Sequence, residues 1–117
     1  MVNPQRGELL LKLGKQNLKA RLTIDAIIRI EQSLGGLSIV HIAQKLSEGK
    51  ATVTDVIKVL TPAIKGGGND VDEKKVAQMI WDANLVNGMR CAGEVLSKAL
   101  NSGVEDEGNE IAEEKLT

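Results

Sequence analysis

Apolar and polar residues alternate near the start of the chain. The alternating apolar positions are Leu9, Leu11, Leu13, Leu18, Ala20 and Leu22. A period of two is typical of a strand with one buried face, and Gly14-Lys15 between the two runs supplies a turn. The pattern therefore predicts a β-hairpin over about residues 7–22. Because an isolated two-stranded hairpin is marginal in water, we expect it to lean on the rest of the fold or to pair its edge with another chain.

Beyond the hairpin, apolar residues recur every three or four positions, which predicts helices. The expected helices cover about residues 24–34, 38–47, 53–65, 73–83 and 85–100. Thr23 and Asp72 are suitable N-caps for the first and the fourth of these helices. Pro62 lies inside the third, so that helix is expected to kink or to end early. Gly66-Gly67-Gly68 is expected to be a hinge or loop.

Each expected helix has apolar residues on one face, and we expect these faces to point inward. The sets are Ile24, Ile27, Ile28 and Leu34; Val40, Ala43 and Leu46; Val53, Val56, Ile57, Leu60 and Ile64; Val76, Ala77, Ile80 and Trp81; and Leu85, Met89, Ala92, Leu96 and Ala99. The predicted fold class is α+β and mostly α, with an N-terminal β-hairpin followed by a compact bundle of four to five short helices. At 117 residues the chain has room for one domain, which we place at residues 1–103.

Charge is unevenly distributed along the chain. Residues 104–117 contain six acidic residues and one lysine, a net charge of −5, whereas the whole chain has a net charge of −1. We therefore expect a flexible acidic tail at 104–117 and a mildly basic body. Trp81 is the only aromatic residue, so the core must be aliphatic and the body lacks the stacking side chains typical of nucleic-acid-binding proteins. Nucleic acid is not an expected partner.

No apolar run has the length that a membrane crossing needs, and no early segment has the pattern of a signal peptide. We therefore expect a soluble protein with no membrane partner. Cys91 is the only cysteine, so an intrachain disulfide is excluded and an intracellular setting fits best.

Cys91 and His41 are the only candidates for a nucleophile and its base. Cys91 lies in an expected amphipathic helix, so a buried, inert thiol is the better interpretation. One His and one Cys do not make a zinc site, and Gly66-Gly67-Gly68 lacks the Lys and Ser/Thr of a phosphate-binding loop. Asp70-Val71-Asp72-Glu73 lacks the rest of a calcium loop, so capping by Asp72 explains it better. We expect no catalytic residue, metal or cofactor, and hence no enzyme.

Leu10 and Trp81 are the two candidate partner-binding residues. Leu10 lies on the polar face of the expected hairpin, and Trp81 is a large amphipathic ring of the kind that anchors interfaces. The helices of the fold itself could cover both side chains. If they are exposed, they mark a partner surface.

The order of several short segments resembles one known family, the tail assembly chaperones of phages and gene transfer agents, also grouped as gene-transfer-agent tail proteins. The segments are Asn3-Pro4-Gln5-Arg6-Gly7, Leu13-Gly14-Lys15, Leu22-Thr23-Ile24-Asp25-Ala26-Ile27-Ile28-Arg29-Ile30-Glu31, Leu46-Ser47-Glu48-Gly49-Lys50, Asp55-Val56-Ile57-Lys58-Val59-Leu60 and Val71-Asp72-Glu73-Lys74-Lys75-Val76. The third segment looks like the family's helix start and signature Glu, here Glu31. The resemblance covers about residues 3–100 and includes no catalytic signature.

The resemblance implies a small helical protein of a phage, prophage or gene transfer agent, working in the cytoplasm of the bacterial host. Such a chaperone binds the tape measure protein, keeps its long helices soluble and helps to recruit tail tube subunits. The implied partners are therefore the tape measure protein and the tail tube protein, and self-association is left open.

Two alternatives remain at this point. The first is a structural tail protein similar to a tail tube, whose hairpin edges would pair into a ring, although a tube protein is normally richer in strands. The second is a small helical regulatory domain, against which the lack of a basic recognition helix counts.

Overall fold

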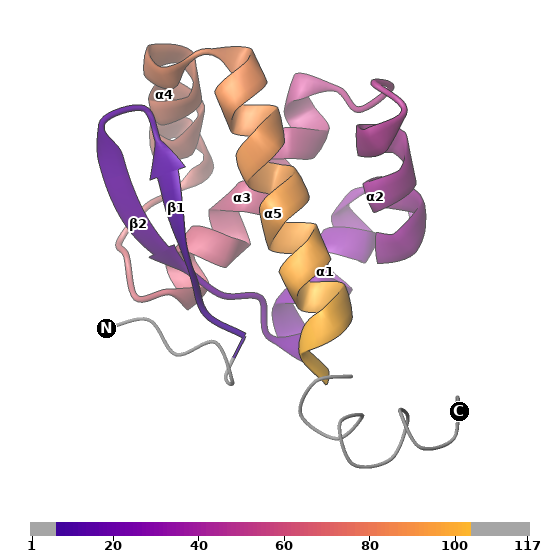
Figure 1. Cartoon of the computed structure of the whole chain (residues 1–117). Coiled ribbons are helices and arrows are strands. Elements are labelled where there is room, and N and C mark those ends of the chain that lie inside the picture. Colours follow the sequence, from indigo (N-terminus) through magenta and orange to yellow (C-terminus); the bar gives the residue numbers. More distant parts are fainter. Residues whose placement is uncertain (1–6, 104–117) are drawn as a thin grey trace, which may run out of the picture.

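The computed structural model describes residues 7–103 of the chain. Its elements are β1 (Leu9–Leu13), β2 (Gln16–Ala20), α1 (Ile24–Ser33), α2 (Ile39–Ser47), α3 (Val53–Gly66), α4 (Glu73–Ala83) and α5 (Leu85–Gly103), as Figure 1 shows. The predicted fold class, an N-terminal antiparallel hairpin followed by a helical bundle, is confirmed. The predicted acidic tail at residues 104–117 lies outside the described residues.

The hairpin packs its leucine face against the helices. Leu11 pairs with Leu18 in the register of the two strands, and Leu11 and Leu13 are buried as the period of two predicts. Gly14, with a φ of +65°, forms the turn. Its N–H donates a hydrogen bond of 2.7 Å to the side-chain oxygen of Asn87 on α5. The hairpin therefore leans on the helices, which is the first of the two expected arrangements.

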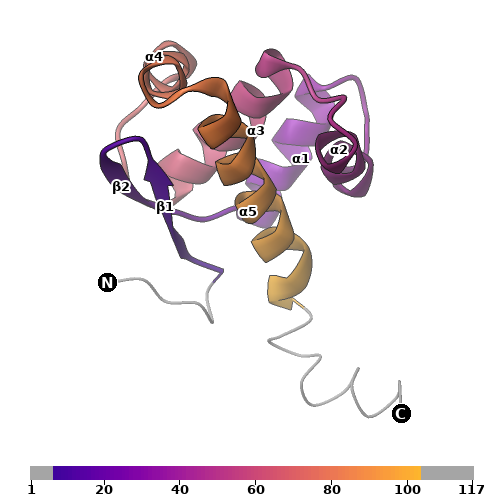
Figure 2. The same cartoon turned by 45° about the horizontal axis from the view of Figure 1, so that its top comes forward.

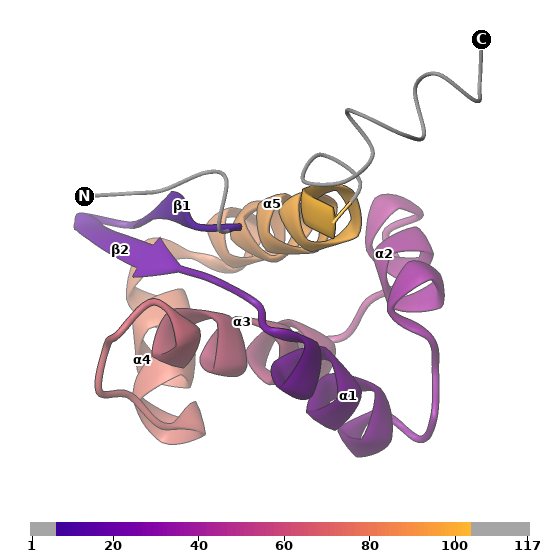
Figure 3. The same ribbon diagram turned by 90° about the horizontal axis from the view of Figure 1, so that it is seen from below.

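The elements form two layers around an aliphatic core. Seen from below in Figure 3, the hairpin, α5 and α2 lie along one side, and α4, α3 and α1 lie along the other. α5 packs against α3, α2, α4 and β1, so it runs through the centre of the first layer. In Figure 2 the C-terminal part of α5 extends past the other helices. The larger fully buried side chains are Leu11, Leu13, Ile30, Leu60, Ile64, Ile80, Leu96, Val59, Val76, Val95 and Cys91.

Both predicted N-caps are confirmed. The hydroxyl of Thr23 accepts a hydrogen bond of 3.1 Å from the N–H of Ala26 in α1. The carboxylate of Asp72 accepts one of 2.8 Å from the N–H of Lys75 in α4. Each cap satisfies an amide that has no partner within the first turn of its helix.

The predicted inner face of α1 is wrong in part. Ile30 is buried, and Ile27 and Leu34 are half-buried, whereas Ile24 is 71% exposed and Ile28 is 45% exposed. α1 has apolar residues on several of its sides, so the sequence periodicity allows either of two rows of side chains to face inward. Packing selects the row at 27, 30 and 34, and the other row faces solvent.

Glu31 connects α1 to the start of α2. Its carboxylate accepts a hydrogen bond of 2.8 Å from the N–H of Ile39, the first residue of α2. A carboxylate is stabilised at the positive end of a helix, so this contact links α1 to the start of α2. Glu31 is the residue that the family resemblance singles out, and here it orients two neighbouring helices.

One predicted inward-facing residue of each other helix is also exposed. These residues are Val40, Val53, Trp81 and Leu85. Neighbouring side chains are buried instead, for example Ile42 on α2 and Met79 on α4. The core is therefore aliphatic as expected, but these four positions lie outside it.

Pro62 does not end α3 early, and that part of the prediction is wrong. The helix continues to Gly66. Proline removes one backbone donor, but Ala63 and Ile64 immediately after it are fully buried and hold the last turn in the core. The carbonyl of Ala63 also accepts a hydrogen bond of 2.8 Å from the N–H of Arg21, just after β2.

Of the two expectations for Gly66-Gly67-Gly68, a loop is present, since Gly67 and Gly68 form a turn after α3, but Gly66 and Gly67 are packed against other backbone and are not a free hinge. Gly66 is the last residue of α3, and Gly67 is its C-cap with a φ of −83°. A Cβ on Gly66 would overlap the carbonyl oxygen of Arg21, and one on Gly67 would overlap that of Lys19. The end of α3 therefore crosses the end of β2 backbone against backbone, which requires glycine for lack of space.

Asp55 stabilises the corner between α2 and α3. Its carboxylate accepts a hydrogen bond of 2.9 Å from the N–H of Thr52, and the hydroxyl of Thr52 accepts one of 3.0 Å from the N–H of Asp55. Lys45 of α2 lies 3.1 Å from the same carboxylate. Burial alone would raise the pKa of Asp55, but the contacts with Thr52 and Lys45 outweigh it and hold the pKa below its usual 3.8.

We expect Asp55→Asn to lower the free energy of unfolding at pH 7 by about 1–2 kcal/mol, because it removes a buried charge partner of Lys45. A depressed folded-state pKa contributes stability above the unfolded pKa of about 3.8, and this is lost as the pH falls through the folded pKa. Urea denaturation of the unchanged protein and of the variant between pH 7 and pH 3 measures the difference in their free energies of unfolding. The difference between them should shrink at the acid end, and a difference that grows there would contradict this account.

Candidate functional site

Leu10 and Trp81 are both exposed. Leu10 on β1 is 51% exposed, because the alternate residues of the strand point into the core, and Trp81 on α4 is 73% exposed. The fold does not cover either side chain, so the condition for a partner surface is met. That a partner binds them stays a prediction.

Cys91 and His41, the two residues considered for chemistry, differ in their surroundings. Cys91 is buried on α5, where its thiol donates a hydrogen bond of 3.4 Å to the carbonyl of Lys12. Burial raises the pKa of this thiol, the charge of Arg90 lowers it by less and that of Glu94 adds to the rise, so the thiol is protonated at neutral pH. His41 is an exposed residue of α2. Within residues 7–103, no group of three or more His, Cys, Asp or Glu side chains is placed to hold a metal ion.

An open apolar groove lies between α2 and α5, and we call it the α2–α5 groove. It has a volume of about 630 Å³. It is lined by Ala43, Leu46 and Ser47 of α2 and by Val86, Met89, Arg90, Gly93, Leu96, Ser97, Leu100 and Asn101 of α5. No residue of the hairpin, α1, α3 or α4 lines it.

The apolar residues of α5 in this groove follow a regular spacing. They are Val86, Met89, Gly93, Leu96 and Leu100, which are separated alternately by three and four positions. This spacing places them in one row along the helix, as in the seam of a coiled coil. Leu96 is buried at the base of the groove, whereas Val86 is 76% exposed and Leu100 is 37% exposed. The row therefore begins and ends at solvent-exposed aliphatic side chains.

Gly93 keeps the middle of the groove open. A Cβ at this position would lie 3.5 Å from the side chain of Leu46 on α2, which is an ordinary contact distance. The glycine is thus not forced by lack of space, unlike Gly67. Its effect is to leave a gap of about one methyl group between the two helices at this position.

The outer edge of the groove is polar. Arg90 and Glu94 form an ion pair of 2.6 Å on the exposed side of α5. At the C-terminal end of the groove, the side-chain amide of Asn101 donates a hydrogen bond of 2.8 Å to the carbonyl of Ser97, one helical turn earlier. An apolar centre with a polar rim is the usual composition of a protein interface.

The sequence interpretation did not identify this groove. It placed Met89 and Leu96 on an inner face and did not consider Val86 or Leu100. The spacing of three and four along α5 is visible in the sequence. What the sequence does not show is that α2 covers only part of this row.

Comparison with known proteins identifies the family. The family described as "Phage tail tube protein, GTA-gp10" matches residues 6–102. The chain therefore belongs to this family of phage and gene-transfer-agent tail proteins. No curated protein and no solved structure gave a match. The predicted tail family is confirmed, whereas the narrower assignment to tail assembly chaperones is not supported by this match, whose description agrees with the tail tube alternative.

No helix within residues 7–103 combines the length and the apolar character that crossing a bilayer requires.

Proposed function

We propose that the protein is a non-enzymatic assembly factor of phage or gene-transfer-agent tails, which holds a helix of the tape measure protein in the α2–α5 groove and helps to recruit tail tube subunits. The observation that carries this proposal is the aliphatic row along α5, open to solvent at Val86 and Leu100.

The groove has the geometry that a third helix needs. A helix that adds to a pair of helices inserts its apolar side chains between theirs, and a row with alternate spacings of three and four accepts such side chains along its length. α2 contributes Ala43 and Leu46, one turn apart, to the opposite wall. Because Gly93 has no side chain, the backbone of an added helix can approach α5 closely at this position.

Leu10 and Trp81 do not line the groove. We assign them to separate contacts, with tail tube subunits or with a second copy of the chain. Their exposed fractions support this assignment, since large apolar side chains on a soluble surface are frequent anchors of interfaces.

Co-expression tests the main role. The chain and the tape measure protein encoded in the same tail gene cluster should be produced together in a bacterial host. We expect the soluble fraction of the tape measure protein to rise several-fold, because the groove covers apolar helix surface that otherwise aggregates. An equal soluble fraction with and without the chain would contradict the proposal.

A second candidate is a structural subunit of the tail tube. The family description names a tail tube protein, so it supports this candidate more directly than the assembly role. In the structure, however, the outer edges of the two strands are partly used. The carbonyl of Lys12 accepts hydrogen bonds from Asn87 and Arg90 at 3.1 and 3.0 Å, and that of Lys19 accepts one from Asn69 at 2.8 Å.

These contacts occupy backbone carbonyls on the strand edges, so fewer backbone groups are left for pairing with the strands of other subunits in a ring. A tube subunit with this fold would have to use its helices for a large share of the contacts. Mass spectrometry of purified particles separates the candidates. A tube subunit is present in many copies per particle, whereas an assembly factor that leaves the finished tail is absent or scarce.

A further inference from the structure

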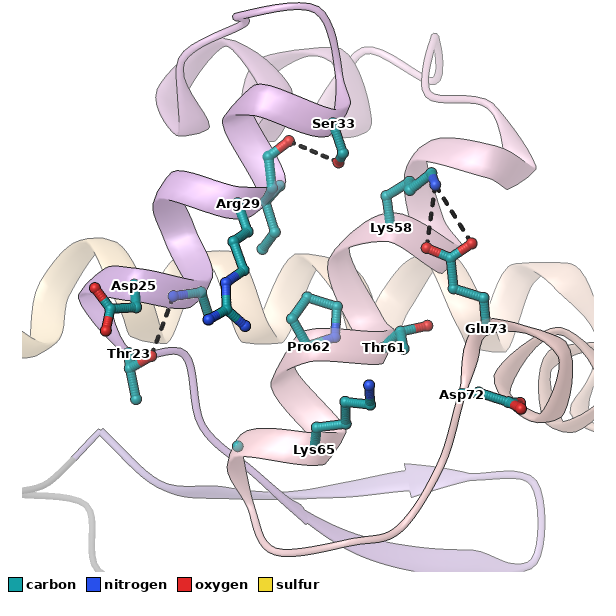
Figure 4. A pocket seen from close by; sticks show the side chains of 13 residues that line it. Thr23, Asp25, Arg29, Ser33, Lys58, Thr61, Pro62, Lys65, Asp72 and Glu73 are labelled. Carbon is teal, nitrogen blue, oxygen red and sulfur yellow. Dashed lines mark hydrogen bonds and ion pairs between the residues drawn. The ribbon is translucent and has the colours of Figure 1, made fainter.

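A polar cleft lies between α1, α3 and the start of α4, on a different part of the surface from the α2–α5 groove (Figure 4). Its volume is about 600 Å³. Three cationic side chains line it, Arg29 on α1 and Lys58 and Lys65 on α3. We call it the Arg29–Lys65 cleft.

Within residues 7–103, two of the three cations have no acidic partner. Lys58 lies 3.1 Å from the carboxylate of Glu73, so its charge is balanced. Neither Arg29 nor Lys65 takes part in an ion pair within the described part of the chain. Figure 4 shows both side chains extending into the cleft from opposite walls. Two like charges that face one cleft repel each other, and an anion bound between them would relieve that repulsion.

The acidic residues of the cleft do not supply this anion. Asp25 and Asp72 line its two ends, and in Figure 4 their carboxylates point away from the centre. The carboxylate of Asp72 is already the N-cap of α4.

The start of α1 adds to the positive character of the cleft. Thr23 and Ala26 line it, so the first turn of a ten-residue helix lies at its wall. Amide groups of a first turn favour negative charge. At the base of the cleft, the hydroxyl of Thr61 is buried and has no hydrogen-bond partner within residues 7–103. The cleft therefore combines unpaired cations, a helix start and an unsatisfied hydroxyl.

We propose that the Arg29–Lys65 cleft binds carboxylates of residues 104–117 of the same chain. This segment carries six acidic residues and one lysine, so its charge is complementary to the two unpaired cations. α5 ends at Gly103, and Figure 1 shows this end of α5 on the same side of the molecule as the start of α1. Each extended residue spans about 3.3 Å, so Glu114, eleven residues after Gly103, can lie up to about 36 Å from the end of α5, a reach comparable with the 32 Å intermediate extent of the molecule. This contact within the chain does not depend on the proposed role in phage tail assembly.

Paramagnetic relaxation in the full chain tests the proposal. A nitroxide attached at Asn109→Cys places the probe within the acidic segment, and Cys91 stays unmodified because it is buried with a raised thiol pKa. Outside the residues that neighbour the probe in sequence, we expect the strongest broadening at the amides of residues 24–26 and 65–67, which include the lining residues Asp25, Ala26, Lys65 and Gly66. Raising the salt to about 0.5 M should weaken it, since screening shortens the reach of charge attraction.

Two matched variants distinguish a site from general charge attraction. Arg29→Gln with Lys65→Gln removes both unpaired cations, and Lys74→Gln with Lys75→Gln removes the same charge from exposed positions on α4. All four side chains are exposed, so both variants should fold. The first variant should reduce the broadening at residues 24–26 by about threefold or more, and the second should leave it nearly unchanged.

Three results would overturn the proposal. One is even broadening over the whole surface, and another is an equal loss in both variants. The third comes from mixing isotope-labelled chain without nitroxide with unlabelled chain that carries it. Broadening of the labelled chain at the cleft would mean that the acidic segment binds a second copy instead of its own chain.

Discussion

Gly67→Ala should be among the most destabilising single substitutions in this chain. The added Cβ would overlap the carbonyl oxygen of Lys19, which belongs to the backbone of β2 and cannot rotate away as a side chain can. Separating α3 from β2 would disturb the hydrogen bond of 2.8 Å from Arg21 to Ala63 and expose part of the core beneath it. We expect the free energy of unfolding to fall by about 3 kcal/mol or more, which lowers the melting temperature by roughly 10–20 °C.

Gly68→Ala is the matched control for this substitution. Gly68 is the next residue, with a φ of +99°, and a Cβ there would meet no atom within 4 Å. Its replacement costs only the strain of a left-handed conformation, about 1 kcal/mol. Thermal and urea denaturation of the two variants measure the difference. If both lose the same stability, the close crossing of α3 and β2 does not exist as described.

Val86→Asp should weaken binding of a tape measure helix by at least about tenfold, or about 1.4 kcal/mol. Val86 is at the open end of the α2–α5 groove, where a partner helix would bury it and would bury the new charge with it. Because the side chain is 76% exposed in the free protein, the substitution should change the free energy of unfolding by less than about 0.5 kcal/mol. Titration of a labelled tape measure fragment with each protein gives the two affinities.

Val40→Asp is the control for this measurement. Val40 is also an exposed valine on a helix, 59% exposed on α2, but it does not line the groove. We expect it to retain the affinity of the unchanged protein within about twofold. Equal losses in the two variants would mean that the contact depends on net charge, and no loss in either would place the partner elsewhere.

Local features of the fold could be predicted from the sequence. The period of two at Leu11 and Leu13 fixed which face of β1 is buried, because each strand residue has only two directions available. The caps at Thr23 and Asp72 followed from residue type and position. These signals need only a few neighbouring residues, so no knowledge of the packed structure is required.

The rotation of the helices could not be predicted in the same way. α1 has apolar residues on several sides, and the choice between Ile24 with Ile28 and Ile27 with Ile30 depends on where α3 and α2 lie. The sequence left a hinge and a loop open at Gly66-Gly67-Gly68 for a similar reason, and the structure has a turn there that is held by packing. A glycine that gives flexibility and one that avoids a clash look the same in a sequence, and only the position of β2 tells them apart.

The α2–α5 groove could not be predicted from the sequence for the same reason: it depends on how the helices pack. Leu10 and Trp81 were found because each stands out within its own element. The α2–α5 groove is formed by two helices separated in sequence by α3 and α4, so it exists only after the helices have packed. Met89 and Leu96 have the apolar character of core residues, and nothing local marks them as the lining of an open groove.

Hydrogen exchange of the full chain with and without the tape measure protein shows directly whether the chain holds a partner helix between α2 and α5. We expect added protection of backbone amides at residues 43–47 and 86–101, with the hairpin at residues 9–20 unchanged. Protection that appears at the strand edges and leaves α5 unchanged, or no added protection anywhere, would contradict this mode of binding.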